Sequence, residues 1–205
     1  ALEFLVKNSG HRRNLEVDFF GGEPMMNFPV VKQLVQYGRE LEKKYNKQFR
    51  FTITTNGLLL DDEALEYINK EFVNVVISLD GRPEVHDKLR ITRSGTGSYE
   101  HIAPKAVKLA ESRNQKDYYV RGTFTKYNKD FDKDVLHLAD LGFKQISVEP
   151  VVASDEEEYH LSTEDLPEIN ESYERLMRAC LVRKNEGKGF NFFHFMVDLK
   201  QGPCA

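Results

Sequence analysis

Two glycines, a glutamate and a proline follow the apolar run 15–20 and form the segment best suited to chemistry. Glycine lets a ligand approach the main chain closely, and proline stiffens a turn while removing a backbone donor. Free carbonyl groups at Gly21 and Gly22 can accept hydrogen bonds from an ammonium group, and Pro24 stiffens the turn. Glu23 is open to two interpretations, a ligand contact or a carboxylate that caps the turn. The segment predicts an amine-binding site, although paired glycines are equally typical of a plain turn.

Four later segments with strand character also end in small or polar residues. Their ends are Thr54-Thr55-Asn56-Gly57, Ser78-Leu79-Asp80-Gly81, Arg121-Gly122-Thr123 and Glu149-Pro150-Val151. In parallel α/β folds the carboxyl ends of the strands converge on one mouth, where ligands bind. We therefore expect these residues to share a site for a ligand that bears an amine, a carboxylate and a ribose.

The strand ends offer different kinds of contact. The guanidinium of Arg121 can fork onto a carboxylate, the hydroxyl of Ser78 can bond a sugar, and Val151 can pack on a base. Asn56 precedes a glycine, a pair that is also common in plain turns. Glu23 and Glu149 together suggest a further alternative, because two carboxylates at strand ends are what glycoside hydrolysis needs.

The elements that position these residues alternate between strand and helix patterns. Strands are expected at 15–20, 49–54, 73–79, 118–125 and 145–152, and helices at 29–45, 63–70, 99–112, 131–141 and 165–186. Such alternation predicts a parallel α/β fold. The run 73–79 is nearly continuous in apolar residues and is expected to be buried on both faces. A long polar loop is expected to follow it, and 190–199 is ambiguous between strand and helix.

Composition excludes several classes of function. The 205 residues carry a net charge of −4, with 40% hydrophobic and 30% charged residues, so we expect one globular domain or slightly more and no nucleic-acid partner. No run is long enough for a membrane span, and no signal peptide opens the sequence. The two cysteines, Cys180 and Cys204, give no disulfide framework, which indicates a cytoplasmic protein. Without an apolar run of membrane-spanning length, we expect no membrane partner.

In this order, the elements resemble the radical S-adenosylmethionine (SAM) enzymes, in which Gly-Gly-Glu-Pro follows the second strand of a six-strand partial barrel. The resemblance covers essentially the whole chain. It implies an α/β fold, a partial (β/α)6 barrel without its first strand and cluster loop. Residues 1–189 would supply strands 2–6, and residues 190–205 would connect to a missing C-terminal SPASM domain. The cofactor-binding residues that we expect are Gly21, Gly22, Glu23, Pro24, Asn56, Ser78, Asp80, Arg121, Glu149 and Val151.

Within that superfamily the sequence is most similar to maturases of six-cysteine (SCIFF) ribosomal peptides. The stretches 110–115, 118–124 and 189–196 carry this likeness. It implies a cysteine-rich precursor peptide as substrate, an external electron donor, and formation of a thioether cross-link through a 5′-deoxyadenosyl radical. Anaerobic sulfatase-maturating enzymes are related and form the alternative. A hydrolase or a non-catalytic binding barrel would be a different class.

One departure from the family is large. The C-x-x-x-C-x-x-C loop that holds the reducing 4Fe-4S cluster is absent, and thiolates are what such a cluster requires. We expect it upstream of Ala1, so this fragment alone should be inactive and has no expected catalytic residue. Cys204 follows Gly202-Pro203 and is expected to ligate an auxiliary 4Fe-4S cluster in the parent. Without the first strand, the edge at 15–20 is uncovered, which favours dimerisation.

Overall fold

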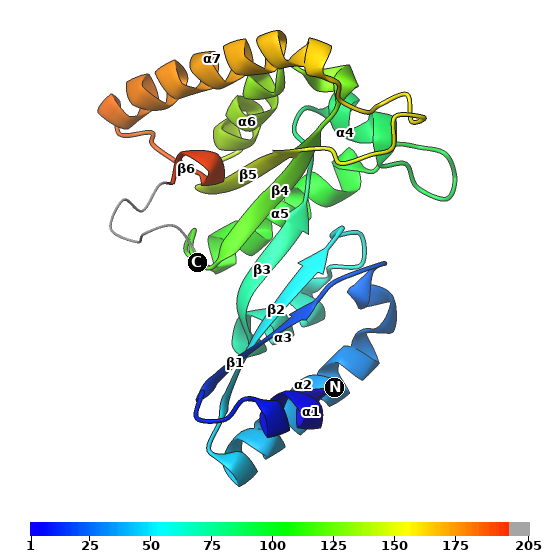
Figure 1. Ribbon diagram of the computed structural model, residues 1–205, viewed down its shortest axis with the longest axis vertical. Coiled ribbons are helices and arrows are strands. Elements are labelled where there is room, and N and C mark those ends of the chain that lie inside the picture. Colours follow the sequence, from blue (N-terminus) through cyan, green and yellow to red (C-terminus); the bar gives the residue numbers. More distant parts are fainter. Residues whose placement is uncertain (197–205) are drawn as a thin grey trace.

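The computed structural model describes residues 1–196 and has a single sheet of parallel strands, ordered along the sheet as along the chain (Figure 1). The strands are β1 (Asn14–Phe19), β2 (Gln48–Thr55), β3 (Phe72–Ser78), β4 (Tyr118–Phe124), β5 (Gln145–Pro150) and β6 (Asn191–Phe192). The sheet is not closed, because β1 and β6 each have one strand neighbour among the described residues. The partial-barrel prediction is thus confirmed.

Helices connect the strands, as parallel pairing of consecutive strands requires. The connecting helices are α2 (Phe28–Tyr45), α3 (Asp62–Glu71), α4 (Pro83–Leu89), α5 (Tyr99–Ser112), α6 (Phe131–Asp140) and α7 (Leu166–Asn185), and α1 (Leu2–Asn8) precedes β1. Short 3₁₀ turns are η1 (Pro24–Asn27), η2 (Lys126–Asn128), η3 (Thr163–Asp165) and η4 (Phe193–Phe195). None of the helices in the described part of the chain combines the length and apolar character that crossing a membrane requires.

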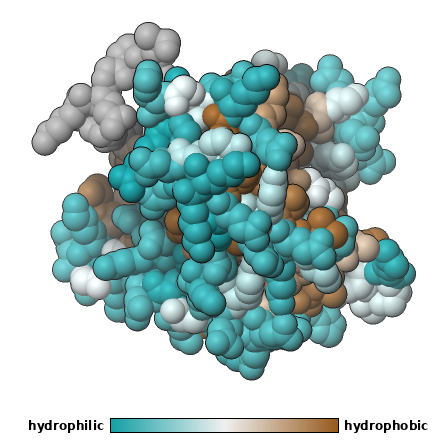
Figure 2. Space-filling view, turned by 90° about the horizontal axis from the view of Figure 1, so that it is seen from below, coloured by the Kyte–Doolittle hydropathy of each residue, from teal (hydrophilic) through white to brown (hydrophobic). Residues whose placement is uncertain are grey.

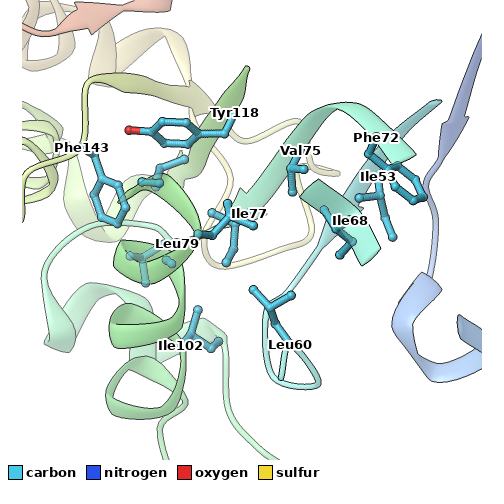
Figure 3. Packing of buried hydrophobic residues seen from close by; sticks show 14 of the residues in the cluster. Ile53, Leu60, Ile68, Phe72, Val75, Ile77, Leu79, Ile102, Tyr118 and Phe143 are labelled. Atoms are coloured by element: carbon cyan, nitrogen blue, oxygen red, sulfur yellow. The ribbon is translucent and has the colours of Figure 1, made fainter. Parts of the chain in front are cut away.

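The core lies between the sheet and these helices. Alternate strand residues such as Ile53, Val75 and Ile77 are fully buried and pack with Ile68 of α3 and Ile102 of α5 (Figure 3). Hydrophilic residues dominate the face in Figure 2, with smaller hydrophobic patches between them. The alternation follows from the period of two along a strand.

The other face of the sheet is polar and partly open, which corrects one expectation. Val75 and Ile77 are buried, but Asn74, Val76 and Ser78 on the opposite face of β3 are only partly buried. Burial on both faces was therefore a wrong prediction for this strand. A continuous apolar run does not reveal that the sheet stays open.

Two segments differ from the sequence-based expectation. The stretch after Asp80 is not a featureless polar loop, because α4 starts with Pro83 in its first turn and a bridge joins Ile91 to Gly97. The ambiguous segment after residue 189 contains both β6 and the 3₁₀ turn η4. The sheet therefore continues to Phe192, beyond the boundary expected at residue 189.

Gly38 sets the distance between α2 and the sheet, which gives a test of the packing. A Cβ at this position would lie 2.6 Å from Cζ of the buried Phe51 ring. We expect Gly38→Ala to lower the free energy of unfolding by about 1–3 kcal/mol through overpacking, although alanine is the better helix former by about 1 kcal/mol. Denaturant unfolding measures the change. Gly38→Ala combined with Phe51→Leu should lose less than the sum of the single changes; a Gly38→Ala variant as stable as the wild type would contradict this packing.

Candidate functional site

A cavity of about 540 Å³ opens at the carboxyl ends of the first four strands. Its lining consists of Phe20, Gly21, Gly22, Glu23, Thr54, Thr55, Asn56, Ser78, Arg90, Arg121 and Thr123. Six of the predicted site residues are thus brought together here: Gly21, Gly22, Glu23, Asn56, Ser78 and Arg121. Pro24, Asp80, Glu149 and Val151 are not part of the lining, and Cys204 lies outside the described residues.

The main chain at Gly21 and Gly22 lies bare along the cavity. Their φ angles are +91° and +52°, in the left-handed region that side chains disfavour. Nothing lies within 4 Å of the position that a Cβ would take at either residue. The backbone conformation, rather than a lack of room for a side chain, therefore explains why glycine occupies these two positions. The open space leaves their peptide groups accessible to a ligand.

Glu23 ties the loop after β1 to the loop after β2. Its Oε1 accepts hydrogen bonds from the Met25 amide at 3.0 Å and the Thr55 hydroxyl at 2.7 Å, and its Oε2 accepts from the Asn56 amide at 2.7 Å. Pro24 lies in the first turn of η1, which Glu23 caps. The carboxylate thus shapes the cavity wall through three protein donors.

Ser78 and Arg121 stand side by side because they are register partners on β3 and β4. The Arg121 guanidinium donates from Nη2 to Oε2 of Glu149 at 2.6 Å, and Glu149 Oε1 accepts from the Ser147 hydroxyl at 3.0 Å. Since Glu149 is engaged in this pair and does not line the cavity with Glu23, the geometry does not support a hydrolytic carboxylate pair. Val151 instead donates its amide to the Phe124 carbonyl at 2.9 Å.

Asp80 holds a second arginine in the cavity wall. This carboxylate is 4% exposed and accepts from Arg90 Nε at 2.5 Å, from Arg90 Nη2 at 3.0 Å and from the Thr123 amide at 2.9 Å. Arg90 lines the cavity although no sequence pattern indicated it. The pairing joins residues ten positions apart through a segment that sequence analysis treated as a loop, so spacing alone gives no signal.

His86 stabilises the position of Asp80 and, through Ser98, that of Arg90. Its Nδ1 accepts the Asp80 amide at 3.2 Å, so Nε2 carries the proton and donates to the Ser98 hydroxyl at 3.0 Å. Ser98 in turn donates to the Arg90 carbonyl at 2.6 Å. Burial lowers the pKa of His86 below its ordinary value, although the nearby Asp80 charge acts in the opposite direction. The acceptor role of Nδ1 and the lowered pKa both favour the neutral imidazole.

A larger groove of about 820 Å³ lies between α7 and residues 189–195. Its lining is mainly apolar and includes Cys180, whose thiol pKa is raised by burial. No group of three or more histidines, cysteines or acids in residues 1–196 could hold a metal ion. The strand-end cavity has the more polar lining and lies at the carboxyl ends of four strands, so it is the candidate site.

Comparison with known proteins places the chain in a family. The model of the radical SAM superfamily matches residues 5–142, and the chain belongs to that superfamily.

Among the curated relatives is the radical SAM cyclopropyl synthase TigE of Paramaledivibacter caminithermalis, 26% identical over 133 residues, which are 63% of this chain and 26% of TigE. A cysteine-type anaerobic sulfatase-maturating enzyme of Clostridium novyi is 30% identical over 107 residues, 49% of this chain and 28% of that enzyme. The chain thus spans about a quarter of the length of these two relatives.

A solved structure has the same fold. Native anSMEcpe with bound AdoMet and Kp18Cys peptide superposes with a TM-score of 0.80 at 19% identity. The match covers 95% of this chain and 54% of anSMEcpe.

The Glu23 bridge gives a test of the cavity wall. Glu23→Ala should lower the free energy of unfolding by about 2 kcal/mol or more, because hydrogen bonds to a charged acceptor are lost. Hydrogen exchange should accelerate at the Met25 and Asn56 amides. Asp61→Ala is the matched control, since it frees the Ala64 amide at the start of α3 and costs about 1 kcal/mol without exposing those two amides. Unchanged protection of Asn56 in Glu23→Ala would refute the bridge.

The depressed pKa of His86 predicts a pH dependence of stability. Because the folded state disfavours the proton, the unfolded state binds more protons below the ordinary pKa of about 6.5. Stability should be fully present above that pH and fall on acidification below it, by at most about 1.4 kcal/mol per pH unit. His86→Asn, which keeps an acceptor for the Asp80 amide, should flatten the unfolding profile between pH 7 and 5. His11→Asn, at an exposed position, should keep the wild-type slope. Equal slopes in wild type and His86→Asn would contradict the assignment.

Proposed function

We propose that the strand-end cavity binds SAM and that the chain supplies most of the SAM pocket of a peptide-modifying radical SAM enzyme. One observation carries this proposal. An accessible main chain at Gly21 and Gly22, the Ser78 hydroxyl and the Arg121 guanidinium all line the same cavity. These groups match three of the polar parts of SAM: the amine, the ribose and the carboxylate.

Each group has a distinct role in this proposal. The carbonyl oxygens of Gly21 and Gly22 accept from the ammonium group, and Glu23 keeps their loop in place through its bonds to β2. Arg121 binds the carboxylate, for which a guanidinium is the preferred partner. Ser78, its neighbour in the register, bonds the ribose.

The chemistry of the full enzyme depends on groups beyond these residues. Bound SAM supplies, on one-electron reduction, a carbon-centred radical that removes a hydrogen atom from the substrate. A 4Fe-4S cluster needs several thiolates, and Cys180 is the single cysteine of residues 1–196. The described residues do not fit such a cluster, so their contribution is to bind SAM, orient it and form the wall of the site.

We further propose a cysteine-containing peptide as substrate and a thioether as product. Forming the bond between a cysteine sulfur and an α-carbon removes one hydrogen from each. One-electron reduction would cleave the bond between sulfur and the 5′-carbon of SAM, and the 5′-deoxyadenosyl group would take the hydrogen atom from the α-carbon and leave as 5′-deoxyadenosine. The sulfur proton would go to solvent. The remaining electron would go to a one-electron acceptor, for which we propose an auxiliary iron–sulfur cluster that Cys204 ligates in the longer protein. The similarity to a sulfatase-maturating enzyme and to the anSMEcpe structure with its bound Kp18Cys peptide supports a peptide substrate. An external electron donor completes the cycle.

Two organisational proposals accompany this function. The partial barrel expected for residues 1–189 extends through β6 to Phe192, and we propose that the chain after it leads into an auxiliary-cluster domain. Within residues 1–196, β1 has a strand neighbour on one side only, and we propose that the chain on its own pairs through the other side.

Binding of S-adenosylhomocysteine (SAH) tests the pocket itself. We expect calorimetry to detect binding of SAH to the chain, and Arg121→Gln to weaken it about tenfold or more because a charge-assisted contact is lost. Arg82→Gln is the matched control, because Arg82 pairs with Asp130 and Asp134 and is not part of the cavity lining. Equal loss of affinity in both variants would mean that Arg121 acts through the fold.

Activity requires the longer natural protein, reconstituted anaerobically with iron and sulfide. Addition of SAM and a strong reductant should yield 5′-deoxyadenosine, and a thioether product should weigh two hydrogens less than the substrate peptide. A sulfatase-derived cysteine peptide distinguishes the second candidate, since preferential turnover of that peptide would favour a sulfatase-maturating enzyme. Absence of 5′-deoxyadenosine in a protein with cluster absorption would overturn the proposal.

A further inference from the structure

Arg121 is held from outside the cavity. Glu149 accepts its Nη2 at 2.6 Å but does not line the cavity, whereas Arg121 does. Glu149 is itself fixed by the Ser147 hydroxyl at 3.0 Å. The register pairs Arg121 with Ser147 and Thr123 with Glu149, so these residues lie on adjacent strands of the polar sheet face.

The contact leaves most of the guanidinium available. Within residues 1–196, Glu149 is the hydrogen-bond partner of Arg121, and it is contacted through Nη2 alone. Nε and Nη1 keep their donors for a ligand, and one hydrogen of Nη2 is also left. A planar fork of this kind binds a carboxylate through two parallel hydrogen bonds.

An arginine side chain otherwise has many rotamers. It carries about 2 kcal/mol of side-chain entropy, which a ligand must overcome to order it. The side chain of Arg121 is 45% exposed, so packing alone does not fix its conformation. The ion pair with Glu149, whose side chain is 32% exposed, fixes it instead. Asp18 on β1 is a second carboxylate that interacts electrostatically with Arg121. Burial raises the pKa of Asp18, and the positive charge of Arg121 acts in the opposite direction.

We infer that Glu149 is a positioning residue that aims the Arg121 fork at the carboxylate end of the ligand, an inference that rests on the proposed function. Glu149 acts through Arg121 and does not touch the ligand. The same contact defines the opposite role for Glu149, which is competition with the ligand. If Glu149 instead competes with the ligand carboxylate for Arg121, its removal strengthens binding, so the sign of one affinity change separates the two roles.

The test compares two probes that share the nucleoside and the sulfur and differ in the amino-acid arm. SAH carries the amine and carboxylate, whereas 5′-methylthioadenosine keeps the nucleoside and the sulfur but lacks both. We expect Glu149→Gln to weaken SAH binding by about tenfold, as for loss of a charge-assisted contact, and to leave 5′-methylthioadenosine binding unchanged. The ratio of the two dissociation constants is a readout that general destabilisation does not move.

Two further variants complete the design. Arg121→Gln with Glu149→Gln should bind SAH as Arg121→Gln does, because Glu149 acts only through the arginine. Glu16→Gln is the matched control, since Glu16 faces Arg50 across β1 and β2 at 3.8 Å and is not part of the cavity. It should leave both affinities unchanged.

The outcomes are distinct. Weaker SAH binding with an unchanged nucleoside affinity supports the positioning role. Stronger SAH binding in Glu149→Gln, an unchanged ratio, or an additional loss in the double variant overturns it. If the wild type binds neither probe, the proposed function fails and Glu149 has no ligand carboxylate to serve.

Discussion

Parallel pairing in sequence order is the constraint on which the rest of the structure depends. It places the carboxyl ends of β1 to β5 along one edge, so residues far apart in sequence meet there. Buried side chains such as Ile53 and Ile77 fix the register from the helix-covered face. A slip of one residue would exchange the buried and polar faces. The site is therefore a consequence of how the core packs.

Carboxylates at this edge organise other protein groups. Glu23 joins two loops, Asp80 holds Arg90, and Glu149 holds Arg121. Each carboxylate holds a backbone segment or a guanidinium group of the site in a fixed position. Preorganisation of this kind lowers the entropy that a ligand must overcome on binding. It also explains why Asp80 and Glu149 stand outside the cavity lining although both lie at strand ends.

The sequence predicted the parts of the fold that depend on local pattern. The bounds of α5, Tyr99–Ser112, agree with the prediction, since apolar spacing and the flanking residues are local signals. The strand ends that form the cavity were found in the same way. Burial on both faces of β3 was predicted wrongly, because periodicity does not report whether a sheet closes. Arg90 was missed because its position depends on its ion pair with Asp80 and on the path of the chain through α4, which local patterns do not report.

A crystal structure of the chain with SAH tests the central claim most directly. The account predicts the ligand in the strand-end cavity, with its ammonium group in hydrogen-bond contact with the carbonyl of Gly21 or Gly22. Its carboxylate should meet the Arg121 fork while Glu149 still accepts from Nη2. SAH seated in the apolar groove beside α7, or bound in the cavity with its carboxylate away from Arg121, would contradict it.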